Sequence, residues 1–271
     1  MSEHSADWYP DPAGRHEHRY WDGRQWTDQV ADHGRQSTDP ITTSAPLPTT
    51  GMSREKIQKQ AGKVGASGAA TSGSVLDQQV LVVNQKVKLI EVNSEFAVYD
   101  ADGTQIAAIR QVGQSALKKV ARFLGSWDQF FTHKLQLVDM TGAVLLTVTR
   151  PAKFMKSKVH ITDGAGNEVG SIIQQNMVGK IRFSLESGGQ PIGSLNGENW
   201  RAWNFNLQDG AGNEVARITK TFEGVAKTLF TNADNYVLQI HGPLSDPLRT
   251  LVIASAVSVD LALKQDNRGL G

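Results

Sequence analysis

The region from about Val75 to Gln265 is predicted to be mainly β, an antiparallel domain closed by an apolar C-terminal helix, and a small β unit precedes it. Three observations predict this fold class. Polar and apolar residues alternate along many short runs, which is typical of strands with one buried face. A turn signal recurs between these runs, and an apolar segment with a helix start follows the last of them.

The alternating runs indicate where the strands lie. In residues 180–186, Ile181, Phe183 and Leu185 are expected to point into the core, because side chains alternate between the two faces of a strand. The same period of two occurs over residues 158–161, 203–208 and 236–240. These runs predict strands that each bury one face.

A repeated turn signal separates the runs. It occurs at Asp100–Gly103, Asp139–Gly142, Asp163–Gly166, Glu186–Gly189 and Asp209–Gly212. The segment DGAGNEV occurs twice, and the last four signals lie about 23 residues apart. Asp opens a turn and Gly supplies a positive φ, as tight hairpins require. About twelve strands in this order are expected to curl and close into a barrel.

A C-terminal core helix is predicted over residues 247–264. Asp246 supplies an N-cap and Pro247 a first helical residue. Between Arg249 and Asp260 the uncharged stretch would span about 15 Å as a helix, against a hydrocarbon core of about 30 Å. We therefore expect this helix to lie inside the barrel, in preference to acting as a transmembrane anchor.

The N-terminal part divides into two predicted segments. Residues 1–30 form a small Trp-rich β unit, in which Asp22-Gly23 predicts a two-residue hairpin turn and the tryptophans are expected to supply most of the core. Residues 31–74 are rich in Ser, Thr, Gly and Pro, which predicts a flexible linker. Within it, residues 54–63 are basic and are expected to be helical only transiently. The barrel domain is expected to cover residues 75–271.

Composition excludes several functional classes. The net charge is +1, so bulk charge does not predict a nucleic-acid partner. There is no cysteine, which excludes disulfides, thiolate sites and palmitoylation. The N-terminus lacks the features of a signal peptide. The sequence contains none of the common hydrolase, P-loop or dinucleotide-binding motifs, so an enzyme is not expected.

Two resemblances to known families add to this interpretation. Residues 8–27, with Trp8-Tyr9-Pro10-Asp11-Pro12 and Tyr20-Trp21-Asp22-Gly23, resemble a short N-terminal domain of unknown function that is common in actinobacterial proteins. Residues 218–236 and the helix from Pro247 resemble the C-terminal signature of the phospholipid scramblase family, in its bacterial branch. That family is similar in fold to Tubby-like and LURP-one-related proteins, which implies a closed barrel of about twelve strands around a hydrophobic helix.

The scramblase resemblance also implies a calcium loop. The matching positions here are Asn232, Asp234 and Asn235, of which only Asp234 is ionised. Calcium prefers six to eight oxygen ligands with sufficient negative charge. A strand-entry turn, capped by Asp234 and Asn235, is the alternative interpretation of the same residues and is preferred. Calcium is therefore only a weak cofactor candidate.

A basic surface is the strongest candidate site. From Arg110 to Arg182 there are eleven Lys or Arg residues against four Asp or Glu residues. Residues 115–124 are expected to form a short basic amphipathic helix, which suits a membrane interface. The alternative is a helix that caps one barrel mouth with a solvated basic face. The candidate lipid-binding residues are Lys118, Lys119, Arg122, Arg150, Lys153, Lys156, Lys158, Lys180 and Arg182.

Three functional hypotheses follow from these features. The first is a scramblase-like protein, cytoplasmic and peripheral at the inner face of the cell membrane, that binds anionic phospholipid head groups through the basic surface. The second is phospholipid scrambling, which the family name implies. The third is a protein-interaction scaffold in which residues 1–30 recruit a partner. The first is preferred, because an enclosed helix offers no lipid path across a bilayer.

Overall fold

The computed structural model describes most of the chain. The described residues are 5–11, 16–24, 26–38, 53–66, 73–84, 94–112, 133–151, 158–176, 181–198, 204–221 and 235–263.

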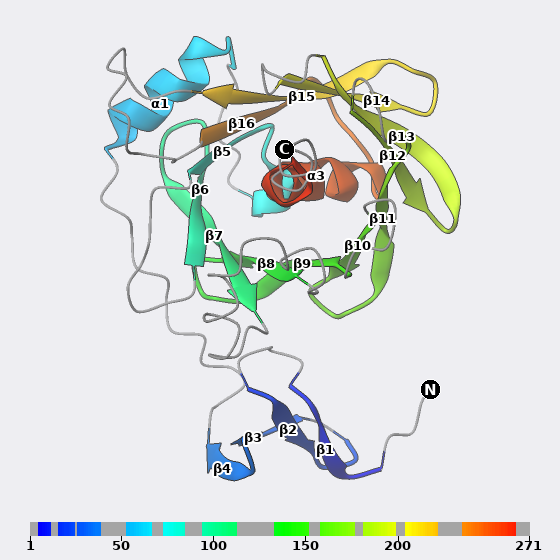
Figure 1. Cartoon of the computed structure of the whole chain (residues 1–271). Helices are drawn as coiled ribbons and strands as arrows, with labels where there is room; N and C mark the ends of the chain where they lie inside the picture. The colour runs from blue at the N-terminus through cyan, green and yellow to red at the C-terminus, as the bar shows by residue number, and fades with distance from the viewer. Residues whose placement is uncertain are drawn as a thin grey trace, which may run out of the picture.

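Twelve antiparallel strands form a closed barrel, as predicted (Figure 1). Each strand pairs with the next along the chain, and the last pairs with the first, so that Val237 lies opposite Val82. The strands are β5 (Val80–Asn84), β6 (Ser94–Tyr99), β7 (Gln105–Val112), β8 (His133–Asp139), β9 (Val144–Arg150), β10 (Lys158–Asp163), β11 (Glu168–Gln174), β12 (Arg182–Ser187), β13 (Gln190–Gly197), β14 (Asn204–Asp209), β15 (Glu214–Thr221) and β16 (Asn235–Ile240).

All five predicted hairpin turns are present, and the four that begin with Asp share one construction. In the fifth, Ser187 pairs with Gln190, and Gly188 and Gly189 have φ values of 57° and 75°. In the β10–β11 turn, Oδ1 of Asp163 accepts hydrogen bonds from the backbone N–H groups of Ala165 (2.9 Å) and Asn167 (2.8 Å). Gly166 has a φ of 88°, which favours glycine. The turns that begin at Asp100, Asp139 and Asp209 repeat these bonds two and four residues on. The chemistry that predicted each turn is therefore local to five residues.

The C-terminal helix α3 (Leu248–Leu263) lies inside the barrel (Figure 1). Its residues from Leu251 to Ser258 are buried, and it contacts β9, β10, β11, β13 and β16. The helix starts one residue later than predicted, at Leu248, so Pro247 precedes it. Asp246 still bonds the first turn, because its Oδ1 accepts from the Thr250 N–H at 3.2 Å and from the Thr250 hydroxyl at 2.6 Å. Arg249 donates to the carbonyls of Leu76 and Gln78, which ties the helix start to the short 3₁₀ helix η1 (Val75–Asp77).

Two glycines let the helix approach the barrel wall. A Cβ on Gly170 would lie 3.2 Å from Leu251 Cδ1, and one on Gly193 would lie 3.0 Å from Leu248 Cδ1. The first turns of α3 therefore pack where β11 and β13 carry no side chain. No helix within the described residues combines the length and the apolar character needed to cross a membrane.

The N-terminal unit is a four-stranded sheet in the order β1 (Asp7–Pro10), β2 (His18–Trp21), β3 (Trp26–Asp32) and β4 (Arg35–Thr38). It extends past the predicted boundary at residue 30. The predicted two-residue turn at Asp22-Gly23 is wrong, because Trp21 pairs with Trp26 and four residues separate them. Asp22 instead accepts from the Arg24 N–H at 2.7 Å, within a longer loop.

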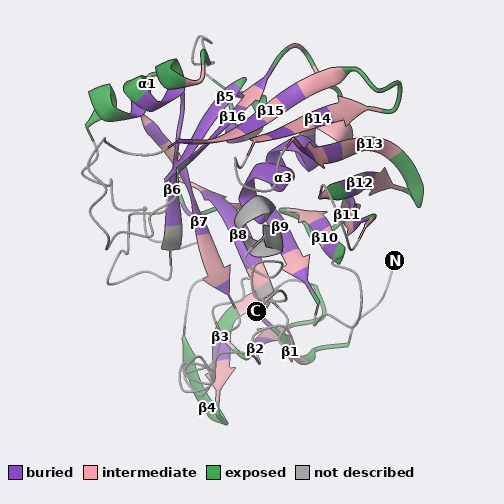
Figure 2. Cartoon of the chain, turned by 45° about the horizontal axis from the view of Figure 1, so that its top comes forward, coloured by how far each residue is buried: buried purple, intermediate pink, exposed green. Residues whose placement is uncertain are grey.

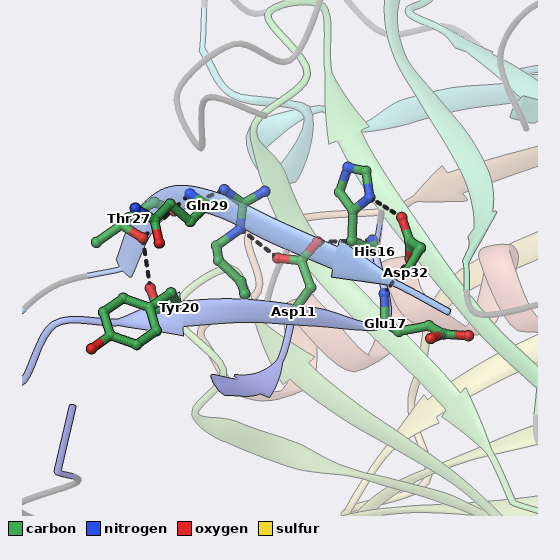
Figure 3. A network of polar contacts seen from close by, with 8 residues as sticks. Asp11, His16, Glu17, Tyr20, Thr27, Gln29 and Asp32 are labelled. Carbon is green, nitrogen blue, oxygen red and sulfur yellow. Dashed lines mark hydrogen bonds and ion pairs between the residues drawn. The ribbon is translucent and has the colours of Figure 1, made fainter. Parts of the chain in front are cut away.

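An ion pair occupies the interior of this small sheet (Figure 3). Arg19 Nε donates to Asp11 Oδ1 at 2.7 Å, and both side chains are fully buried. Arg19 also donates to the carbonyl of Thr27 at 2.9 Å, while the His16 N–H donates to the second oxygen of Asp11. The expectation that tryptophans supply most of this core is wrong. Trp8, Trp21 and Trp26 are only half-buried and contact other rings on the sheet surface.

Part of the predicted linker is a helix that packs on the barrel. Helix α1 (Arg54–Lys63) buries Ile57 and Ala61 against an apolar cluster on the outer wall that includes Val82 and Tyr99 (Figure 2). The side-chain amide of Gln58 donates to the Asp102 carbonyl at 3.1 Å. The expectation of a flexible linker over 31–74 is therefore wrong for residues 53–66, and also for β4.

Candidate functional site

The two ends of the barrel differ in how they join the strands. At one end, called here the turn end, the five tight turns over 100–104, 139–143, 163–167, 187–190 and 209–213 join consecutive strands. At the other, called here the connection end, the strands flank longer segments over 85–93, 113–132, 151–157, 175–181, 198–203 and 222–234. Because neighbouring strands are antiparallel, every longer segment begins and ends at this one end. Of the predicted lipid-binding residues, Arg150, Lys158 and Arg182 are described, and each is a terminal residue of its strand at the connection end.

Three cations stand on the outer wall at the connection end. Lys158 is the first residue of β10 and Arg182 the first of β12, and both are exposed. Lys134, the second residue of β8, is half-buried. Their neighbours Val159, Phe183 and Leu135 belong to the inner core, so the cations point outward. This set of Lys134, Lys158 and Arg182 is called the cation row.

The spacing of the cation row follows from the strand order. β8, β10 and β12 alternate with β9 and β11 around the barrel. Neighbouring strands lie about 4.8 Å apart, so successive cations are about 10 Å apart across the strands. They are also offset by two residues along the strands, because Lys134 is level with His160 and Lys158 is level with Ser184. Lys134 is not among the residues predicted to bind lipid. The alternation of Leu135 and Leu137 nevertheless predicts that its side chain lies on the outer face.

Arg150 does not belong to this surface. It is the last residue of β9 and alternates with Leu146 and Val148 of the inner core, so it lies on the inward side of the strand. Its exposed fraction is 4%. Lys220, opposite Tyr236 of the core, is a half-buried cation on the inward side at the same end. The inclusion of Arg150 among the surface cations is therefore corrected.

The remaining candidate residues cannot be placed in the same way. Asn235 begins β16 and pairs with Asn84 of β5 and Thr221 of β15. Within the part of the chain that the structure describes, no three His, Asp or Glu side chains gather as metal ligands. The candidates outside the described residues are Lys118, Lys119, Arg122, Lys153, Lys156 and Lys180 for lipid, and Asn232 and Asp234 for calcium.

Two carboxylates of the turn end, those of Asp163 and Asp209, are held in their ionised form. The side-chain amide of Asn167 donates to Asp163 Oδ2 at 2.9 Å, and this bond keeps the pKa of Asp163 below its ordinary value. Asn213 lowers the pKa of Asp209 in the same way. Hydrogen bonds to the charged form favour ionisation. The turn end is therefore anionic near neutral pH, whereas the cation row marks the opposite end.

Comparisons with known proteins agree with this architecture. Residues 71–263 match the Scramblase family, and residues 6–39 match a family of unknown function, DUF2510. A phospholipid scramblase family protein of Schizosaccharomyces pombe is 22% identical over 68% of this chain, which spans about half (52%) of that relative. Altered inheritance rate of mitochondria protein 25 of Saccharomyces cerevisiae is 22% identical over 69% of this chain and 71% of its own length. No solved structure matches this chain.

Proposed function

Because this chain belongs to the Scramblase family, we propose that it binds anionic phospholipid head groups through the connection end of its barrel. It acts there as a peripheral protein at the inner face of the cell membrane. The family match supports a phospholipid-related function, and a relative from Schizosaccharomyces pombe carries the name phospholipid scramblase family protein. The lipid and the site are the parts that this proposal adds.

The observation that carries the proposal is the cation row. Lys134, Lys158 and Arg182 project from the outer wall of three alternate strands at one end. A cation close to an anionic leaflet adds about 1 kcal/mol of binding free energy, so the row supplies about 3 kcal/mol.

Scrambling, the second hypothesis, has less support from the described residues. The apolar side chains of α3 from Leu251 to Val257 are buried, with Leu251 and Val252 fully so, and this part of the helix therefore presents no apolar surface to lipid tails. Head-group binding needs no such surface. Calcium has no step in the proposal, because Asp234 is the only carboxylate among its three candidate ligands.

Vesicle sedimentation at low salt tests the proposal. We expect the wild-type chain to bind vesicles that contain phosphatidylserine and not vesicles of phosphatidylcholine alone. The variant Lys134→Glu/Lys158→Glu/Arg182→Glu is expected to bind at least about 100-fold more weakly, since about 1.4 kcal/mol corresponds to a factor of ten. Equal binding of the wild type to both vesicle types would contradict the proposal.

A matched control separates location from overall charge. Helix α1 carries three exposed lysines, Lys56, Lys59 and Lys63. Its residues Arg54 and Gln58 lie against the β6–β7 turn, which belongs to the turn end. Reversing these three changes the net charge by the same amount, and we expect a much smaller loss of binding. A dithionite assay on proteoliposomes distinguishes scrambling from head-group binding. Dithionite quenches fluorescent lipids in the outer leaflet, so it reaches inner-leaflet lipids only if the protein translocates them. A pull-down with residues 1–38 addresses the third, the recruitment of a protein partner.

A further inference from the structure

The described charges of the barrel are separated along its axis. At the turn end, carboxylates gather in every region that joins or flanks the strands. They are Asp77, Asp100, Asp102, Asp139, Asp163, Glu168, Glu186, Asp209, Glu214 and Asp246. Arg249, a cation at this end, donates hydrogen bonds to the carbonyls of Leu76 and Gln78. The turn end therefore presents mainly negative charge to solvent.

The connection end has the opposite sign. The cation row lies here, and Glu198, a carboxylate described at this end, is bonded to Arg217 at 2.6 Å. Arg217, within β15, also bonds Glu214 of the turn end at 2.8 Å. Neither exposed member of the row, Lys158 or Arg182, lies beside a described carboxylate in the strand register. The positive charge at this end is therefore available to an external anion.

Helix α1 departs from this pattern on one flank only. Arg54 lies against the β6–β7 turn, where a Cβ on Gly103 would meet its Cα at 2.8 Å. The helix packs on β5, and its lysines lie on one exposed side of the helix because Lys56, Lys59 and Lys63 are spaced by three and four residues. The β8–β9, β10–β11 and β14–β15 turns are formed by strands other than those that α1 covers, and they stay acidic.

The two ends are far enough apart to act separately. A strand of seven residues, such as β8 or β11, spans about 23 Å at about 3.3 Å per residue. The Debye length at physiological ionic strength is about 8 Å. A membrane that touches one end is therefore screened from the charges of the other, so the end that meets the surface decides the sign of the interaction.

We infer that the barrel meets an anionic bilayer end-on, with the connection end against the head groups and the turn end in the water. This inference rests on the proposed function and adds the geometry of the complex. The barrel axis lies along the membrane normal. Since α3 enters at the turn end, its C-terminal end points toward the bilayer and its Asp246 cap points away. The turn carboxylates, fixed by their backbone hydrogen bonds, repel the bilayer when the barrel approaches the other way round.

Single-cysteine variants of the full chain test the orientation, because the wild-type sequence has no cysteine to remove. Pro151 and Gln175 are exposed at the connection end, and Ala165 and Ala211 are exposed at the turn end. Each variant, Pro151→Cys, Gln175→Cys, Ala165→Cys or Ala211→Cys, is labelled with a polarity-sensitive fluorophore. Vesicles of phosphatidylserine and phosphatidylcholine carry a spin-labelled lipid as the quencher.

The expected result is a blue shift and at least about two-fold quenching at positions 151 and 175, with neither change at 165 and 211. Two positions at each end guard against one variant that fails to fold. Equal quenching at all four positions, or quenching at 165 and 211 alone, overturns the end-on orientation while lipid binding stands. If the labelled and unlabelled chains fail to sediment with these vesicles, the proposed function falls, and the orientation falls with it.

Discussion

Carboxylates stabilise both folded parts of this chain, but they lie in different places. In the N-terminal sheet, Asp11 is in the interior, paired with Arg19, and both side chains are inaccessible to solvent. In the barrel, Asp163 and Asp209 lie at exposed turns and bond backbone N–H groups. The barrel interior is mainly apolar instead and is filled by α3 and the inward side chains of the strands, with Arg150 and Lys220 on the inward side at the connection end.

The difference follows from size. Four short strands cannot enclose a large apolar core, so the sheet uses a buried salt bridge. Further hydrogen bonds within the same unit, from Arg19 to the Thr27 carbonyl and from the His16 N–H to Asp11, support this pair. The twelve strands of the barrel enclose a whole helix, and their carboxylates are free to close turns. Disrupting an interior group should therefore have a large effect in either part, and disrupting a turn a small one.

The largest effect is expected from Arg19→Met in the N-terminal sheet. This change leaves the buried Asp11 carboxylate without its guanidinium, which costs about 3–5 kcal/mol, enough to unfold so small a unit. In ¹H–¹⁵N spectra, the indole signals of Trp8, Trp21 and Trp26 are expected to collapse to random-coil positions. The barrel amides are expected to keep their shifts, since Asp11 and Thr27, which Arg19 bonds, both lie in the N-terminal unit.

The double variant Asp11→Leu/Arg19→Met is the control for this prediction. Replacing both charges by apolar groups removes the unpaired carboxylate, so most of the lost stability should return. If the single variant kept dispersed indole signals, the interior ion pair would not be what holds the sheet together, and the contrast with the barrel would disappear.

A smaller but still large effect is expected from Leu251→Ala in α3. Leu251 is fully buried and lies next to Gly170 of β11, so its truncation opens a cavity between helix and wall. Such changes cost about 2–5 kcal/mol. Urea unfolding followed by circular dichroism should show a lower midpoint with an unchanged slope. Ser245→Ala, at an exposed position just before the helix, serves as the control, and a loss below about 1 kcal/mol for Leu251→Ala would argue against an enclosed helix.

The sequence predicted the barrel well because its signals are local. Each turn is specified within five residues, as the two DGAGNEV segments show, and Asp246 caps α3 from four residues before Thr250. The period of two also predicts the inward position of Arg150, because Leu146 and Val148, on the same face of β9, belong to the core. The assignment of Arg150 to the basic surface rests on its charge and disregards this alternation.

The features that were missed depend on distant partners. Helix α1 looks like a polar linker, since Ile57 and Ala61 are its principal buried apolar residues, and their partners Val82 and Tyr99 come from strands further along the chain. The turn after Trp21 was misjudged because the Trp21–Trp26 pairing, and not Asp22-Gly23 alone, sets the loop length. The Asp11–Arg19 pair joins a loop and a strand that carry no shared local pattern. The candidate cations were found from charge count, but their arrangement on alternate strands required the barrel's order.

The smallest effect is expected at a turn, and the repeated segment supplies its own control. Asn167→Ala removes the amide that lowers the pKa of Asp163, so this pKa should rise toward its ordinary value, while that of Asp209, still bonded to Asn213, should not move. A lowered pKa in the folded state gives stability that is present above the unfolded pKa and is lost as the pH falls through the folded one. In the variant the contribution of Asp163 to the free energy of unfolding is therefore smaller and disappears at a higher pH.

Carboxyl ¹³C shifts followed from pH 6 down to about pH 2 report both aspartates in one sample. Equal shifts of the two pKa values would mean that the turns are coupled, whereas an unchanged Asp163 would mean that the backbone N–H groups of Ala165 and Asn167 suffice to hold its charge.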